Sequence, residues 1–564
     1  MITIDKIDFN KLKSYDGKTT KCFEQLCYQI AQKEFGHLGT FTPIDGSGGD
    51  GGVEFYLKLN NGEKWGWQCK FFGDTGRLNK GSRYSQIKNS LNTAIRNHPD
   101  LTKWFLCLKT DLTDDNLSSK GKLSTGEKNW FENELTRVIP SNRIIELKHW
   151  GETSFITFLK DPKHIGIRNF FFGELEFNQN WFEKRFDENF QKVKDKYDPD
   201  LHTIDKRTQS KIDFLLVDPN YTQLTQELKK ELLEKANNIE TALYDFRNER
   251  ILTSEESYQR NTFFLTCQEF KKHIDYVLKK IDFIESCFIE YKPELLSKFD
   301  SEELYKDFIK YFEEINYRVF EEKSQAYKDA SNIVDLISEI DEIYNSFFIN
   351  FFHDKRRVIH FIGDAAKGKT HISCDIAYKR IANSNPAIFI TGDKFTDETS
   401  IIDALKKTLD IPQEFSVDDF LQALDIYASI IKASIPLIID GLNETTSNRL
   451  FSPIWKNHLS AFISKVLQTK NLILITTYRN SYVDRIWDRK TTKELHYLYG
   501  FDDYETINEA VKKYFTKYKI KADLPFASLE KFRDPIFLRI YCEIKNPNWK
   551  TLNEVSVNIE EEST

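Results

Sequence analysis

A phosphate-binding loop constrains the fold of this chain more than any other feature of its sequence. Residues 363–370 match the pattern GxxxxGK(S/T) and directly follow the apolar run Val358–Ile362. In this pattern the glycines let main-chain N–H groups converge on a phosphate, the lysine binds the β- and γ-phosphates, and the final hydroxyl binds Mg²⁺. The sequence therefore predicts an ATP site that comprises Gly363, Asp364, Ala365, Ala366, Lys367, Gly368, Lys369, Thr370 and His371.

Short apolar runs recur after this loop and are separated by helix-length segments. This alternation is typical of a doubly wound parallel sheet, so residues 341–525 are predicted to form a P-loop NTPase core. The expected strands are Val358–Ile362, Ala387–Thr391, Ile435–Ile439 and Leu472–Thr476. Residues 526–564 are expected to begin a further helical region that is truncated here.

A second acidic motif completes the predicted nucleotide site. Asp440 ends an apolar strand, which would set its carboxylate beside Mg²⁺ at the carboxyl edge of the sheet, together with Thr370. Asn443 and Glu444 follow directly and are expected to orient or deprotonate the attacking water. Arg479 follows the next strand and is a candidate sensor of the γ-phosphate, although a surface salt bridge would explain it equally well.

The N-terminal 163 residues carry a different arrangement. A glycine-rich turn precedes Glu54, and an aromatic strand ends in Gln68, Cys69 and Lys70. This arrangement resembles the PD-(D/E)xK nuclease fold, in which a carboxylate on one strand and a ligand two residues before a lysine on the next hold Mg²⁺ against a scissile phosphate while the lysine stabilises developing charge. The expected metal ligands are Glu54, the amide oxygen of Gln68 and the main-chain carbonyl of Cys69. Two other carboxylates are candidates for the same site, namely Glu24 and Asp50.

The middle of the chain, residues 164–340, is predicted to be a helical linker region without chemistry of its own. Apolar residues recur there at three- and four-residue spacing in Leu224–Asn248, Tyr258–Lys292 and Glu302–Glu322. The net charge of −7 does not by itself indicate nucleic-acid binding. The eight cysteines are scattered without a CxxC pair, which predicts buried, reduced thiols in a cytoplasmic protein and no zinc site. No stretch approaches the roughly 18 apolar residues that a membrane span needs, so no membrane association is expected.

The string Asp440-Gly-Leu-Asn-Glu resembles the acidic motif of NACHT-type proteins in the STAND class of P-loop NTPases. Residues 533–538, RDPIFL, resemble the motif of that class in which a proline, here Pro535, contacts the base or ribose. The resemblance implies a switch that holds nucleotide when closed and oligomerises when triggered. Ala366 stands where the family usually has a glycine, which is expected to tighten the loop and slow hydrolysis. Nucleotide binding is therefore expected, but fast turnover is not.

The N-terminal motif resembles the PD-(D/E)xK fold of Mrr-like restriction endonucleases, in which glutamine replaces the second acid. Together, GGVEFY, EKWGWQCKFF, AKGKTHIS and DGLNE resemble antiviral STAND NTPases (Avs) with a nuclease effector, with a weaker match at Tyr197–His202. This resemblance implies an Mg²⁺-dependent DNA endonuclease of antiphage defence that acts as a homo-oligomer, in that family a tetramer. It also implies a phage protein as trigger, such as the large terminase or the portal, sensed by a C-terminal region that is expected to be missing here or supplied by another chain.

Two other functions remain open at this level. The first is a restriction endonuclease whose NTPase drives DNA translocation, for which turnover would rise with DNA length. The second is a catalytically inactive nuclease fold that serves as a DNA-binding scaffold, against which intact Glu54 and Lys70 argue.

Overall fold

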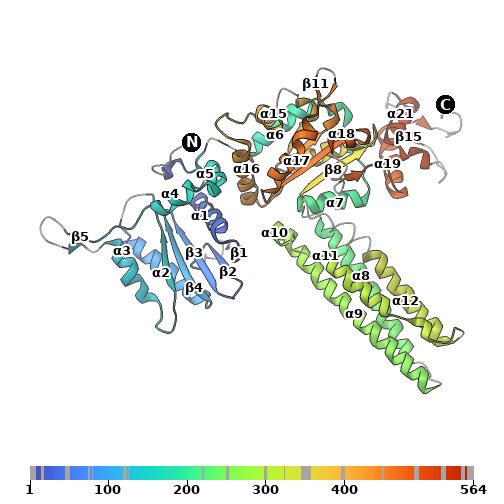
Figure 1. Cartoon of the computed structure of the whole chain (residues 1–564), viewed down its shortest axis with the longest axis horizontal. Helices are drawn as coiled ribbons and strands as arrows, with labels where there is room; N and C mark the ends of the chain where they lie inside the picture. Colours follow the sequence, from blue (N-terminus) through green and yellow to red (C-terminus); the bar gives the residue numbers. More distant parts are fainter. Residues whose placement is uncertain are drawn as a thin grey trace. The chain divides into compact units, whose positions relative to one another are not determined.

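The computed structural model of the chain contains two compact units. The first comprises Met1–Glu176 with Pro412–Ile430, and the second comprises Phe177–Ile411 with Ile431–Thr564 (Figure 1). The structure describes residues 8–13, 18–44, 51–73, 77–78, 81–117, 123–124, 126–173, 175, 177–218, 221–248, 253–296, 301–322, 324–344, 357–395, 400–447, 450–487, 495–521, 529–547 and 553–554. Each unit contains a five-stranded sheet with helices, which confirms the predicted multidomain α/β class at that level. The finer domain assignments remain predictions.

The sheet of the first unit is mixed. Its strands are β1 (Gly39–Pro43), β2 (Phe55–Leu59), β3 (Lys64–Lys70), β4 (Leu101–Leu108) and β7 (Glu146–Trp150), in that spatial order. Strands β1, β2 and β3 pair antiparallel, whereas β3, β4 and β7 pair parallel. The tight connection between β2 and β3 and the helical crossover from β3 to β4 follow the rule that parallel neighbours need the longer connection.

Successive side chains of β3 and β4 point to opposite faces of the sheet, and both faces are buried there. On one face Trp67 stacks on Phe105 with ring centroids 4.5 Å apart, and Phe35 of α1 (Thr19–Phe35) lies against both rings. On the other face Trp104 shares a core with Leu91 of α2 (Gly81–Asn97). Figure 1 shows α1 and α2 flanking the strands. The two faces are therefore covered by different helices, α1 on the side of Trp67 and α2 on the side of Trp104.

Helix α16 (Val417–Ile431) belongs mostly to the first unit although it is distant in sequence. Gln29 Nε2 of α1 donates a hydrogen bond of 3.1 Å to Ser429 Oγ of α16. Gly166 of α5 (Ile165–Phe172) approaches Gln422 so closely that a Cβ there would lie 2.7 Å from the glutamine Cβ. A glycine at 166 therefore permits the close packing of α5 and α16.

The sheet of the second unit is entirely parallel. Its spatial order is β14 (Leu495–Tyr497), β8 (Val358–Gly363), β13 (Leu472–Arg479), β10 (Ile435–Asp440) and β9 (Ile388–Thr391). The four predicted strands are confirmed, and β14 was missed because its three residues carry no apolar run. The longer helices of this part are α14 (Lys369–Ala382), α15 (Ile401–Leu409), α17 (Ile454–Leu467), α19 (Tyr504–Lys517) and α21 (Pro535–Lys545).

Two helices that precede the phosphate-binding loop in sequence pack onto this sheet. They are α6 (Gln179–Phe190) and α7 (Lys206–Leu216). Phe186 of α6 and Leu215 of α7 share one hydrophobic core with Phe389 and Ile475 of the strands. These helices lie within the range predicted as a helical linker region, yet they complete the hydrophobic core against the parallel sheet.

Four longer helices form a separate bundle within the second unit (Figure 1). They are α8 (Tyr221–Asn248), α9 (Ser254–Ile289), α11 (Ser301–Glu314) and α12 (Gln325–Tyr344), and they enclose a continuous apolar core. The helix predicted at Glu302–Glu322 is wrong in its last third. Asn316 ends the regular pattern there because its side chain accepts from Arg318 N and caps a short 3₁₀ turn.

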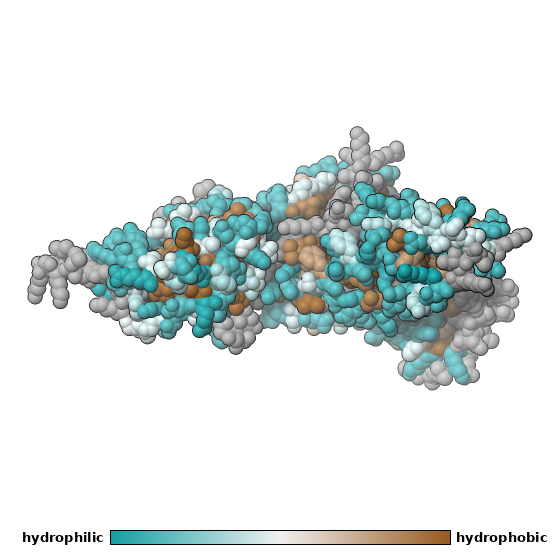
Figure 2. Space-filling view, turned by 90° about the horizontal axis from the view of Figure 1, so that it is seen from below, coloured by the Kyte–Doolittle hydropathy of each residue, from teal (hydrophilic) through white to brown (hydrophobic). Residues whose placement is uncertain are grey.

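Shorter elements complete the two units. They are α3 (Glu127–Asn129), α4 (Glu152–Lys160), α10 (Pro293–Leu296), α18 (Val483–Ile486), β5 (Asn116–Leu117), β6 (Leu123–Ser124), β11 (Thr446–Ser447), β12 (Leu450–Phe451), β15 (Ile520–Lys521) and β16 (Asn553–Glu554). The face drawn in Figure 2 is largely hydrophilic, with smaller hydrophobic patches between the polar residues. Among the helices described, none combines the length and apolar character that a membrane crossing requires.

Candidate functional site

The phosphate-binding loop and the acidic strand meet at the carboxyl edge of the parallel sheet. Thr370 Oγ1, in the first turn of α14, donates a hydrogen bond of 2.9 Å to Asp440 Oδ2 at the end of β10. The predicted Mg²⁺ ligands, a hydroxyl and a carboxylate, are thus side by side. Asp440 is only 2% exposed, so its charge lies in a medium where it interacts strongly with a cation.

Thr477 is a second hydroxyl at this edge that the sequence prediction missed. Its Oγ1 donates to Asp440 Oδ1 at 2.6 Å and accepts from Gly441 N at 2.8 Å. Both oxygens of the carboxylate are therefore held in place by hydroxyl groups. The available signal was the pair of threonines that follows the apolar run of β13, beside the acidic strand.

Lys369 folds back along the loop that carries it. Its ammonium donates to the carbonyl oxygens of Gly363 at 2.9 Å and Asp364 at 2.5 Å. Burial lowers the pKa of Lys369 to about 8; Asp440 opposes this shift and Arg479 adds to it. The lysine therefore loses its proton at a pH well below the usual range for an ammonium group.

This shift predicts a pH-dependent affinity for ATP. The phosphates attract the charged ammonium, and the free protein loses that charge as the pH rises through about 8. We expect the affinity for Mg-ATP to be flat from pH 6.5 to 7.5 and to fall by up to about tenfold per pH unit above 8. Titration calorimetry at several pH values measures this. Lys369→Arg, which stays charged, should remove the decline; an equal decline in that variant would contradict the assignment.

The loop backbone contains a strained residue. Ala366 has φ of +63° and Gly368 has φ of +88°. Glycine adopts this left-handed region freely, whereas a residue with a Cβ pays on the order of 1 kcal/mol or more. The alanine that departs from the family pattern thus occupies a position where glycine fits better.

Ala366→Gly is therefore expected to raise the free energy of unfolding by about 0.5–1 kcal/mol, because relief of strain exceeds the extra chain entropy of glycine. Ala365→Gly is the matched control: Ala365 is not among the residues with positive φ, so the same change there should destabilise. Chemical denaturation of both variants measures the difference. Equal effects of the two substitutions would contradict the strain at Ala366.

The loop opens onto a cavity of about 380 Å³. Predicted residues that line it include the loop from Ala365 to His371, Asn443, Glu444, Arg479 and Pro535. Residues that the sequence prediction missed also line it: Lys196, Leu201, His202, Thr203, Ile204, Asp205, Tyr514 and Arg539. Those from 196 to 205 belong to the range to which no chemistry was assigned. The weak family match at Tyr197–His202 was the signal for them.

A buried polar cluster holds this missed segment against the phosphate-binding helix. The rings of His202 and His371 stack at 5.6 Å, and Tyr197 OH donates to Asp375 Oδ1 at 2.9 Å. Burial lowers the pKa of His371 to about 4 and that of His202 to about 2, and each of these histidines is uncharged at neutral pH. The cluster therefore links residues 197–202 to α14 without adding positive charge near the loop.

The region of the predicted proline motif also reaches the loop. Lys367 Nζ lies 2.5 Å from Asp534 Oδ2, and Asp534 caps α21 by accepting from the main-chain N–H groups of Ile536 and Phe537. Pro535, the first residue of that helix, lines the cavity. An ion pair thus ties the phosphate-binding loop to the start of α21.

Asn443 and Glu444, which follow the acidic strand β10, have different surroundings. Asn443 Oδ1 accepts from the main-chain N–H of Arg479 at 3.0 Å, which fixes the turn after β10 to the end of β13. Burial raises the pKa of Glu444; Lys196 opposes this shift, and Asp440 adds to it. A carboxylate with a raised pKa is better suited to accept a proton from water than one with an ordinary pKa.

The first unit has its own polar cavity, of about 510 Å³. Glu24 of α1 and Glu54, directly before β2, both line it, together with Lys21 and Tyr28. Two of the predicted carboxylates are therefore brought to one cavity from separate elements. Asp50 lies outside the described residues.

Gln68 contacts Glu54 directly. Its Nε2 donates a hydrogen bond of 2.5 Å to Glu54 Oε1, and the main-chain N–H of Glu54 donates to Trp67 O at 2.7 Å. Gln68 is fully buried in β3. Its amide nitrogen orients the carboxylate here, and ligation of a metal through Oε1 would require the amide to turn.

Lys70 and Cys69 end the same strand. Lys70 shares the face of β3 that carries Gln68, because side chains two residues apart in a strand point to the same side. The side chain of Cys69 points to the opposite, buried face, in register with Cys107 of β4. The face that carries Gln68 therefore has the spacing that a QxK motif needs.

Comparisons with known proteins give no match to any family model. They also give no match to a curated protein.

Proposed function

We propose that this chain is a nucleotide-gated, Mg²⁺-dependent DNA endonuclease. Phosphodiester cleavage is assigned to the first unit, and ATP binding with slow hydrolysis to the second. The observation that carries the cleavage assignment is the meeting of Glu54 with Gln68 at 2.5 Å beside a cavity that Glu24 also lines. Oxygen ligands of this kind suit Mg²⁺ or Mn²⁺.

In the proposed cleavage step, Glu54, the main-chain carbonyl of Cys69 and, once its amide has turned, Gln68 Oε1 would hold Mg²⁺, with Glu24 as a further ligand. The metal supplies Lewis acidity and a more acidic bound water. Lys70 would stabilise the charge that develops on the phosphate. Lysines at the cavity, such as Lys21, offer positive charge for the DNA backbone despite the net charge of −7.

In the proposed nucleotide step, Lys369 and the loop N–H groups would bind the phosphates, while Thr370 and Asp440 would hold Mg²⁺. The bond between Thr370 and Asp440 supports this assignment. Glu444, whose pKa is raised, is the candidate base for the attacking water, and Arg479 the candidate γ-phosphate sensor. Pro535 and the residues from 196 to 205 would surround the base and ribose.

Chain connectivity supports gating. Most of α16 belongs to the first unit, and the chain leaves this helix directly into β10, whose last residue is Asp440. A shift of β10 on nucleotide binding would therefore act on a helix that packs within the nuclease unit. By family resemblance, a phage protein such as the large terminase or portal triggers assembly into a homo-oligomer, in which the nuclease units act together in antiphage defence.

The test is a plasmid-cleavage assay with Mg²⁺, with and without ATP, in the presence and absence of a purified terminase or portal protein. Cleavage that requires the metal and increases with ATP would support the proposal. A folded protein that binds ATP but leaves DNA intact in every arm would contradict the nuclease assignment and favour a DNA-binding scaffold. Turnover of ATP that rises with DNA length would instead favour a translocating motor.

A further inference from the structure

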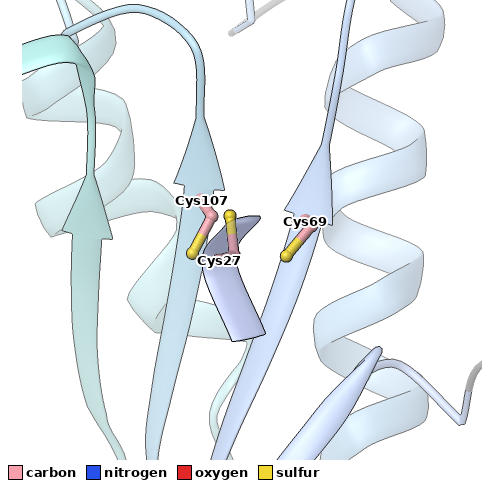
Figure 3. A group of neighbouring side chains, drawn as sticks. All are labelled: Cys27, Cys69 and Cys107. Carbon is pink, nitrogen blue, oxygen red and sulfur yellow. The ribbon is translucent and has the colours of Figure 1, made fainter. Parts of the chain in front are cut away.

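Three cysteines that are far apart in sequence meet in the core of the first unit. Cys27 comes from α1, Cys69 from β3 and Cys107 from β4, and their sulfur atoms all lie within 4.8 Å of one another. Figure 3 shows the three side chains converging between the helix and the two neighbouring strands. This arrangement was not predicted, because the spacing of the cysteines in the sequence gives no sign of a cluster.

The backbone fixes these positions firmly. Cys69 and Cys107 are register partners in a parallel strand pair, so their side chains leave the same face of the sheet side by side. Cys27 lies on the helix that covers this face. Two of the three side chains are fully buried and Cys69 is 4% exposed. The sulfur atoms are therefore held together by the fold itself and need no large rearrangement to share a ligand.

The geometry points to a soft-metal site, and we propose that Cys27, Cys69 and Cys107 bind one Cu(I) ion. Metal–sulfur bonds of about 2.3 Å in a trigonal arrangement separate the sulfurs by about 4 Å, within the observed spacing. Thiolate ligands select soft cations such as Cu(I). The proposal uses the sulfur of Cys69, whereas the nuclease proposal uses only its main-chain carbonyl, so neither proposal depends on the other.

Zinc fits this site less well. Structural zinc takes four ligands, and its preferred geometry is tetrahedral. Within the described part of the chain, the cluster offers three ligand atoms from His, Cys, Asp or Glu side chains. The burial of all three cysteines also leaves little access for a water molecule as the fourth ligand. A cation that accepts three sulfur donors is therefore favoured.

The protonation state of the bound ligands sets the number of protons released. The thiolate is the form of cysteine that binds a metal, so three cysteines that bind one Cu(I) ion lose all three thiol protons. The loaded site then carries two negative charges in a buried layer, which makes its affinity rise with pH. We therefore expect about three protons to be released for each ion bound.

The test is an anaerobic titration of the reduced full chain with Cu(I) in competition with bicinchoninate, combined with proton-release measurements in weak buffer. We expect one ion per chain. Loss of a residue that only supports a metal ligand costs about 10- to 100-fold in metal affinity. Loss of a ligand itself should therefore cost at least about 100-fold in each of the variants Cys27→Ser, Cys69→Ser and Cys107→Ser. Cys22→Ser, a buried cysteine of the same helix α1, is the matched control and should bind as the unsubstituted chain does.

Circular dichroism and thermal unfolding without metal distinguish loss of the site from loss of the fold. Should a serine variant fail to fold, Cys107→Ala, which introduces no buried hydroxyl, takes its place. X-ray absorption of the Cu(I)-loaded protein should report three sulfur neighbours. The proposal is overturned by unchanged binding in the folded variants, by binding lost equally in Cys22→Ser, or by a disulfide within the trio in place of metal binding.

Discussion

Lys369→Ala is expected to weaken Mg-ATP binding by about 100-fold or more and to remove any effect of ATP on DNA cleavage. The lysine is half-buried at the loop and donates to the Gly363 and Asp364 carbonyls, from which it can swing to the phosphates. Truncation of a charge-assisted contact to a phosphate costs roughly 2–5 kcal/mol, which corresponds to a factor of about 30 to several thousand in affinity. Titration calorimetry with ATP and Mg²⁺ measures the loss.

Lys512→Ala is the matched control for this substitution. Lys512 is an exposed lysine of α19 in the same unit, so its removal changes the net charge equally without touching the loop. We expect its ATP affinity to stay within about twofold of the unsubstituted chain. Comparable losses in both variants would show that general charge, and not the loop contact, governs nucleotide binding.

Lys70→Ala is expected to reduce DNA cleavage by about 100- to 1,000-fold and to leave ATP binding unchanged. A donor that stabilises charge at the transition state contributes on this order. Glu54→Gln should have an effect at least as large, because it removes a charge that holds the metal. Single-turnover cleavage of a labelled duplex at saturating Mg²⁺ measures both.

Lys58→Ala controls for the loss of a lysine from the same sheet. Lys58 is exposed on β2, next to the strand that carries Gln68 and Lys70. The Lys58→Ala substitution should leave the DNA cleavage rate largely unchanged. Full cleavage by Lys70→Ala would contradict the active-site assignment. Loss of ATP binding in Lys70→Ala would indicate a damaged fold instead.

The sequence predicted the parallel sheet of the second unit well because strong local patterns determine it. Four apolar strands and a loop whose spacing is dictated by phosphate geometry were located within a few residues. The partnership of Thr370 and Asp440 followed from the rule that carboxyl ends of parallel strands share one edge. Periodicity likewise located α8, α9 and the first part of the segment that contains α11, whereas α12 was not predicted.

Contacts between segments that are distant in sequence could not be predicted from local sequence patterns. Thr477, His202 and Arg539 reach the cavity only because β13, the segment before α7, and α21 converge on it. The membership of α16 in the first unit has no local signature either, since an amphipathic helix does not reveal which surface it covers. The same holds for the three cysteines, whose meeting depends on strand register and not on spacing.

The central claim is that nucleotide bound to the second unit controls cleavage by the first. The most direct measurement is the rate of Mg²⁺-dependent DNA cleavage as a function of ATP concentration, set beside the ATP dissociation constant of the same preparation. The account predicts that the half-maximal rate coincides with that constant and that Lys369→Ala gives no response to ATP. A cleavage rate that is full without ATP and unaffected by Lys369→Ala would contradict it.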